Sequence, residues 1–225
     1  LMFGQILFTQ WKSIKLGMIP FAIAAFGLPI LAVRGLGGDH SGSTSAMLDM
    51  QFLFRSWEAW LPLFPALAVT VGMVTALNAW NWDHRGEHIY SLSMPIHRWK
   101  YALYKMGAGA LLLLLPATAM WFGALAASAS LSLPPGLNTY PTLLAVRFLV
   151  AGLLAFSFMF ALASGTIRTT VIVFSTLFGG ILILAVAGDV LSGLEWNLNM
   201  VIERLMVEWL GPLQVFSGNW VLIDV

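Results

Sequence analysis

The chain has 225 residues, of which 59% are hydrophobic and 9% charged, and its mean hydropathy is +0.85. An average soluble domain has about 25% charged residues, so this composition excludes that class and indicates an all-α polytopic membrane protein. A net charge of +1 gives no basic excess for nucleic-acid binding, and the lack of cysteine excludes disulfides, thiol catalysis and cysteine-ligated clusters.

Residues 1–16 are predicted to form an interfacial helix ahead of the first span. Apolar residues recur there at helical spacing, with a polar stripe on the opposite face. The two sets are Phe3, Leu7, Trp11 and Ile14, and Gln5, Thr9, Lys12 and Ser13. Such a helix lies along the membrane surface. The alternative is a plain extension of the first span.

Five runs with few or no charges are long enough to cross a bilayer, which takes about 20 residues. The predicted spans are 17–34, 59–82, 104–130, 142–164 and 169–188. The fourth contains Arg147, about 8 Å from the start of its helix, where the side chain can reach the membrane surface. We therefore expect no charge deep inside a span.

Lysine and arginine counts predict a cytoplasmic N-terminus. In that orientation the inner side carries seven basic residues and the outer side four. The inner set is Lys12, Lys15, Arg85, Arg98, Lys100, Lys105 and Arg168, and the outer set is Arg34, Arg55, Arg147 and Arg204. The segment 83–100 is thereby placed in the cytoplasm, and the protein in the cytoplasmic membrane.

Residues 195–210 are predicted to form an amphipathic helix on the outer side, because an apolar stripe alternates there with polar residues at helical spacing. The apolar tail that follows, 209–223, is too short for a span, and Gly211, Pro212 and Gly218 interrupt it.

The segment 83–100, DHRGEHIYSLSMPIHRWK, holds three of the four histidines. His84, Glu87 and His88 match H-x-x-E-H, a zinc-protease motif in which two histidines bind zinc and the glutamate is the general base. A third ligand is missing from the cytoplasmic side, because the next acidic residue, Asp189, is predicted outside. A membrane zinc hydrolase is the alternative function.

Two other interpretations of this segment remain open, an ordinary charged loop and a docking surface. Residues 89–96 are too hydrophobic for a free loop and too short for a span. Ile89, Leu92 and Ile96 fall on one helical face, and Pro95 stands near the end. A short amphipathic helix of this kind would present an apolar face to another protein.

Residues 85–105, RGEHIYSLSMPIHRWKYALYK, resemble the segment between spans two and three of ABC transporter permeases of the type-two exporter class. There, an acidic residue precedes a leucine- and serine-rich stretch. A Leu-x-x-Pro-Ile/Val-x-Arg turn follows, and then a lysine where span three begins. The counterparts in this chain are Glu87, Leu92, Pro95, Ile96, Arg98 and Lys105.

The resemblance implies a single permease domain over 1–225 that binds no cofactor itself. ATP and Mg would be bound by a separate ATP-binding cassette subunit, since no Gly-x-x-x-x-Gly-Lys-Ser/Thr occurs here. A second permease copy or homologue would complete the transporter, which would export an apolar or amphipathic substrate. Six spans are implied, so we expect the sixth either beyond Val225 or in the broken tail after Trp209.

The resemblance also assigns roles within 83–100, which becomes the coupling helix that docks on the ATPase. Its apolar face would make the contact through Ile89, Leu92 and Ile96. Glu87, Arg98 and Lys105 would tie the helix to neighbouring cytoplasmic elements.

Overall fold

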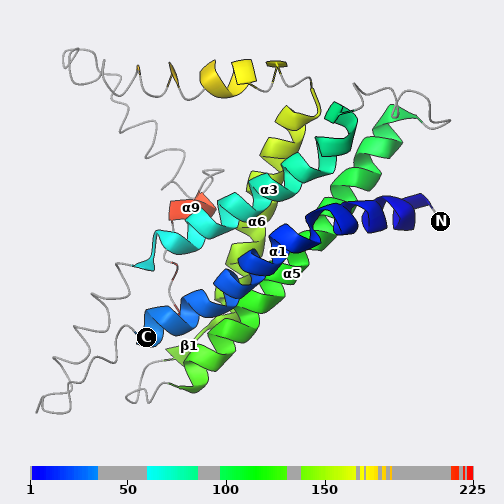
Figure 1. Ribbon diagram of the computed structural model, residues 1–225. Coiled ribbons are helices and arrows are strands. Elements are labelled where there is room, and N and C mark those ends of the chain that lie inside the picture. The colour runs from blue at the N-terminus through cyan, green and yellow to red at the C-terminus, as the bar shows by residue number, and fades with distance from the viewer. Residues whose placement is uncertain are drawn as a thin grey trace, which may run out of the picture.

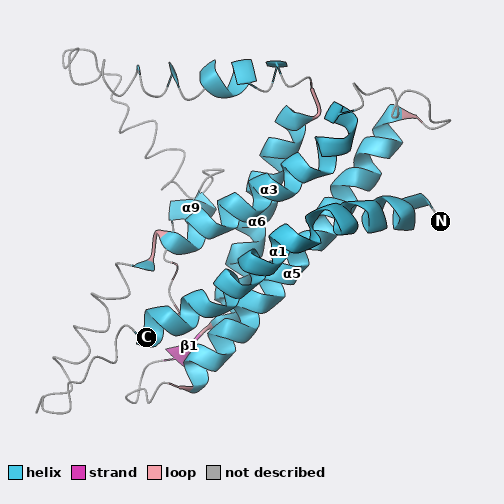
Figure 2. Ribbon diagram, viewed as in Figure 1, coloured by secondary structure: helices cyan, strands magenta, loops and turns pink. Residues whose placement is uncertain are grey.

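The computed structural model describes residues 2–34, 60–85, 97–130, 138–165, 168–169, 171–176, 179–180, 183, 214–217, 220 and 222–224. Four long helices dominate this part of the chain: α1 (Met2–Arg34), α3 (Leu63–Arg85), α5 (Arg98–Ala129) and α6 (Pro141–Ala163). Near the C-terminus lie a short helix, α9 (Gln214–Ser217), and the strand β2 (Ile223–Asp224), which pairs with β1 (Asn138–Thr139). Figures 1 and 2 show the long helices side by side in one bundle.

All four long helices contain a stretch long and apolar enough to cross a membrane, namely Met2–Val33, Leu63–Asn81, Arg98–Ala129 and Pro141–Ala163. These segments agree with an all-helical membrane protein, and they overlap the first four predicted spans. The described residues between 168 and 183 are helical, but much of 169–188 lies outside the described residues. The fifth span therefore stays a prediction, and the predicted outer helix 195–210 lies wholly outside that part.

The bundle consists of two parallel helix pairs, α1 with α5 and α3 with α6, and α5 also packs on α6 (Figure 1). Each pair meets at a glycine. A Cβ on Gly72 of α3 would lie 2.5 Å from the Gly152 carbonyl oxygen of α6, and one on Gly123 of α5 would overlap the Phe26 carbonyl oxygen of α1. Small residues at such points let helix backbones approach closely, which is how membrane helices gain van der Waals contact.

The predicted interfacial helix and the first span form one continuous helix, α1. The predicted boundary at residue 16 is therefore not a break in the helix, although Figure 1 shows α1 changing direction within its N-terminal half. Pro20 gives the physical reason, because it lacks the N–H that would bond the Leu16 carbonyl and its ring clashes there.

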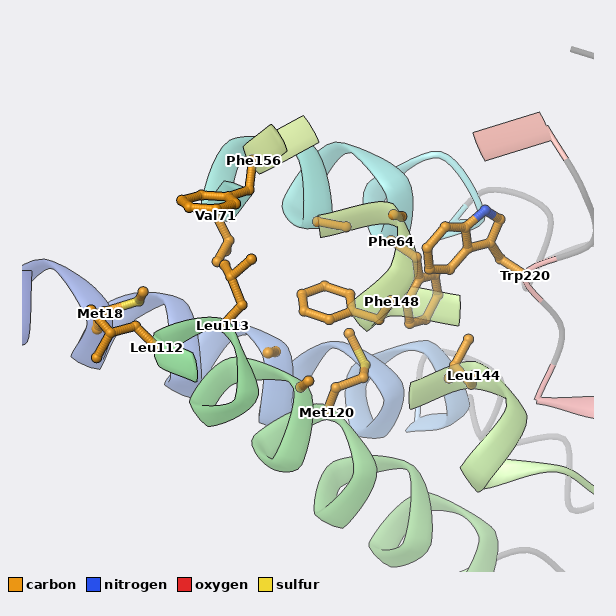
Figure 3. Close-up of a cluster of buried hydrophobic side chains, with 14 of the residues drawn as sticks. Met18, Phe64, Val71, Leu112, Leu113, Met120, Leu144, Phe148, Phe156 and Trp220 are labelled. Carbon is orange, nitrogen blue, oxygen red and sulfur yellow. The ribbon is translucent and has the colours of Figure 1, made fainter. Parts of the chain in front are cut away.

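The core fills the space between the two pairs (Figure 3). Met18 of α1 lies beside Leu112 of α5, and Val71 of α3 beside Phe156 of α6. Phe156 is fully buried, and its ring covers Gly109 of α5 so closely that a Cβ there would lie 2.5 Å from the ring. This contact joins the two helix pairs.

The C-terminal tail folds back onto the end of the bundle where α3 and α6 begin. Trp220, 2% exposed, stacks on Phe64 of α3 with 6.4 Å between ring centroids. The Tyr140 N–H donates a 2.8 Å hydrogen bond to the Leu222 carbonyl and extends the β1–β2 pairing. The tail was predicted to be too short for a span, and its last residues are instead part of the core.

The second and third spans differ from prediction at their facing ends. The second was predicted to end at residue 82, but α3 continues to Arg85. The third was predicted to begin at residue 104, but α5 begins at Arg98. Residues 83–85 and 98–100 of the predicted coupling segment are therefore helical extensions of the spans, and 86–96 lie outside the described residues.

Candidate functional site

A buried ion pair joins the end of α3 to the beginning of α5. Lys105 Nζ lies 2.6 Å from Asp83 Oδ2, and the two side chains are 6% and 3% exposed. It is the one ion pair within the described part of the chain. Charged groups inside a membrane protein are costly unless they are paired, so such a pair marks a candidate functional site.

The pair is held by further contacts from the same two helices. The Tyr101 hydroxyl donates to Asp83 Oδ1 at 3.2 Å, and Lys105 Nζ donates to the Ala79 carbonyl at 2.8 Å. Lys105 Nζ also lies 4.5 Å from the ring centroid of Trp80 and 4.9 Å from that of Tyr101. The ammonium thus has a carboxylate, a carbonyl and two aromatic faces around it, which replace its hydration shell.

Helix α1 completes this site, which we call the Asp83–Lys105 cluster: Gln10, Ser13, Asn78, Trp80, Asp83, Tyr101 and Lys105. Gln10 Nε2 donates to the Lys105 carbonyl at 3.3 Å, and Asn78 Nδ2 donates to the Gln10 carbonyl at 3.5 Å. The Ser13 hydroxyl donates to Asn78 Oδ1 at 2.8 Å. Three helices therefore meet in one polar network at this end of the bundle.

This arrangement has a mechanical consequence. Asp83 and Lys105 neutralise each other, and the bond between them fixes the last turn of α3 to the second turn of α5. The segment 86–97 begins and ends at those two helices. A buried ion pair adds little net stability over an apolar pair, but removing one partner leaves an uncompensated charge. The cluster is suited to holding two helix ends in one register.

The structure separates the predicted coupling residues into three groups. Arg98 is exposed in the first turn of α5. Lys105 is buried and its charge is directed to Asp83 inside the bundle. Its predicted role in tying the coupling segment to neighbouring elements stays a prediction. The remaining five, Glu87, Ile89, Leu92, Pro95 and Ile96, lie outside the described residues.

The pairing of Asp83 with Lys105 was not predicted from the sequence. The sequence predicts Asp83 to follow span two directly and Lys105 to lie where span three begins, without pairing the two side chains. A signal was present, because opposite charges stand at the facing ends of two consecutive spans. Such ends can come together when consecutive helices run antiparallel.

The zinc motif falls mostly outside the described residues, because the structure does not describe the side chains of His84, Glu87 and His88. Asp83, the acidic neighbour of His84, is engaged by Lys105 and Tyr101. Among the described side chains, no group of three could hold a metal ion.

A second cation lies at the opposite end of the bundle. Arg147 of α6 donates through Nε to the Val215 carbonyl of α9 at 3.3 Å, and its guanidinium lies 5.6 Å from the ring centroid of Trp220. The sequence predicts that Arg147 lies near the start of its span, from where its side chain can reach the membrane surface. In the structure its contacts fasten the C-terminal tail to the bundle.

No family model, curated protein or solved structure matches this sequence. A functional assignment therefore has to rest on the residues of the chain.

Proposed function

We propose that the chain is the membrane-spanning permease subunit of an ATP-driven ABC exporter, coupled through 83–100 to a separate ATP-binding subunit. The observation that carries the proposal is the placement of the Asp83–Lys105 cluster. It ties together the two helices that flank the segment resembling a coupling helix, so a force on that segment would reach both helices together.

The packing of the bundle supports transmission over a longer distance. Helix α3 packs along α6, and α5 packs along α1, in each case through a close glycine contact. A push on 86–97 would therefore move two helix pairs about the α5–α6 contact. Rigid-body movement of packed helices is a standard route from a local event to a change of access across a protein.

The apolar character of the spans supports an apolar or amphipathic cargo. Pathways for ions need buried polar groups within the membrane. In the described spans, the charged side chains that are buried or half-buried lie near helix ends, at Asp83 and Lys105 on one side and at Arg147 on the other.

Charge reversal at Glu87 tests the proposal. Glu87→Lys should let the permease fold, insert and bind its ATPase, while ATP hydrolysis no longer drives transport, because the predicted tie of the coupling helix is lost. A matched control is Glu203→Lys, an acidic residue predicted on the opposite side of the membrane. Normal ATP-driven transport by Glu87→Lys would show that the coupling assignment is wrong.

The zinc hydrolase alternative has a separate test that needs no substrate. We expect metal analysis of the purified chain to find less than stoichiometric zinc. Stoichiometric zinc that is lost in His84→Ala would contradict the permease assignment and support the enzyme.

A further inference from the structure

An apolar groove runs along the outside of the bundle between α1 and α5, with a volume of about 350 Å³. Every residue that lines it is apolar. Six come from α1 and two from α5: Trp11, Met18, Ile19, Ala22, Ile23 and Phe26, and Leu115 and Ala119. Several of these side chains are open to the surroundings, with Ile19 52% and Ile23 66% exposed.

Two lysines stand at the N-terminal end of this groove, on the same face of α1. Lys15 follows Trp11 by four residues and precedes Ile19 by four, so the three side chains form one ladder along the helix. Lys12 precedes Ile19 by seven residues, or two turns. Both lysines are exposed, and neither side chain has an ion-pair or hydrogen-bond partner within the described part of the chain.

We propose that this groove binds an anionic phospholipid of the leaflet at the N-terminal end of α1. One acyl chain would lie in the groove, and the headgroup would bind Lys12 and Lys15. This site is independent of the proposed transport function, since it needs only that α1 and α5 span the membrane.

The dimensions fit one leaflet. From Trp11 to Phe26 the groove follows α1 for fifteen residues, about 22 Å at 1.5 Å per residue. Half of a bilayer's hydrocarbon core is about 15 Å, so the groove can hold most of an acyl chain and still meet the headgroup region. Trp11 lies at the charged end, where tryptophan suits the membrane–water boundary.

Charge decides between a lipid and a second copy of the chain. In a twofold-symmetric dimer the same patch meets itself, so Lys12 and Lys15 would approach their own copies across the contact. Like charges opposed in this way disfavour association. An anionic headgroup would instead neutralise both lysines. Each lysine should raise the affinity for an anionic lipid, relative to a zwitterionic one, about fivefold.

Quenching of Trp11 fluorescence by brominated acyl chains tests the proposal. The full chain is reconstituted into phosphatidylcholine vesicles that contain either brominated phosphatidylglycerol or brominated phosphatidylcholine. Trp11 is one of ten tryptophans, so its share of the signal is the difference between wild type and Trp11→Phe. We expect half-maximal quenching of Trp11 at about a twenty-five-fold lower fraction of the anionic lipid.

The double variant Lys12→Gln/Lys15→Gln should bring the two quenching curves together, while Lys100→Gln, an exposed cation at the same end on α5, should leave them apart. Equal quenching of the wild type by both lipids would overturn the anionic preference. Absence of Trp11 quenching by either lipid would show that no acyl chain lies in the groove, and it would overturn the site itself.

Discussion

Replacing Lys105 by methionine should destabilise the bundle far more than any exposed charge does. Methionine keeps most of the apolar stem of lysine but removes the ammonium, and with it the bonds to Asp83 and the Ala79 carbonyl. The Asp83 carboxylate, 3% exposed, then keeps the Tyr101 hydroxyl as its donor within the described residues. Breaking a buried pair in this way costs about 3–5 kcal/mol.

For a chain of this length, about 1 kcal/mol lowers the melting temperature by about 2–4 °C, so Lys105→Met should melt about 6–20 °C below wild type. The assay is heating in mild detergent, followed by size-exclusion chromatography to measure the protein that remains monodisperse. Lys100→Met, an exposed cation five residues earlier, is the control and should stay within about 0.5 kcal/mol of wild type.

A double-mutant cycle separates the interaction energy between Asp83 and Lys105 from the effect of each single substitution. Asp83→Asn alone should also destabilise, because it leaves the Lys105 ammonium buried without a carboxylate. The double variant Asp83→Asn/Lys105→Met should recover much of the loss, since no uncompensated charge remains. Additive losses in the double variant, or a wild-type melting temperature for Lys105→Met, would refute the reasoning.

Two further predictions concern packing, measured by the same heating assay. Gly123→Ala should destabilise by about 1–3 kcal/mol, because its Cβ would overlap the Phe26 carbonyl oxygen, whereas Gly27→Ala, with nothing within 4 Å, should be neutral or mildly stabilising; equal effects would contradict the close α1–α5 approach. Trp220→Ala should cost about 3–5 kcal/mol, because it empties the site against Phe64, and should increase protease cleavage after 213; an unchanged melting temperature would show that the tail is not part of the core.

Hydropathy predicted the four described spans because a bilayer demands about 20 apolar residues with all backbone groups bonded internally. It misplaced the facing ends of the second and third spans, since α3 continues past Asp83 and α5 begins seven residues before Lys105. A hydropathy average over one stretch of sequence counts each charge separately and cannot register a partner on another helix. The two can be buried because they neutralise each other across two helices, and that depends on three-dimensional pairing.

The return of the C-terminal tail was not predictable from periodicity either. The β1–β2 ladder joins two residues on each strand, too few for an alternating pattern. The available signal was the apolar run around Trp220 and Leu222. Its burial depends on a space beside Phe64 that exists only once α3 and α6 are packed.

The coupling of 83–100 to an ATP-binding subunit is tested most directly by site-specific cross-linking. The chain has no cysteine, so Ser91→Cys in that segment and Ser130→Cys at the far end of α5 each introduce a single thiol. After cross-linking in native membranes, we predict that Ser91→Cys joins a polypeptide with a Gly-x-x-x-x-Gly-Lys-Ser/Thr motif and that Ser130→Cys does not. Cross-linking of such a polypeptide through Ser130→Cys instead, or through neither position, would contradict the account.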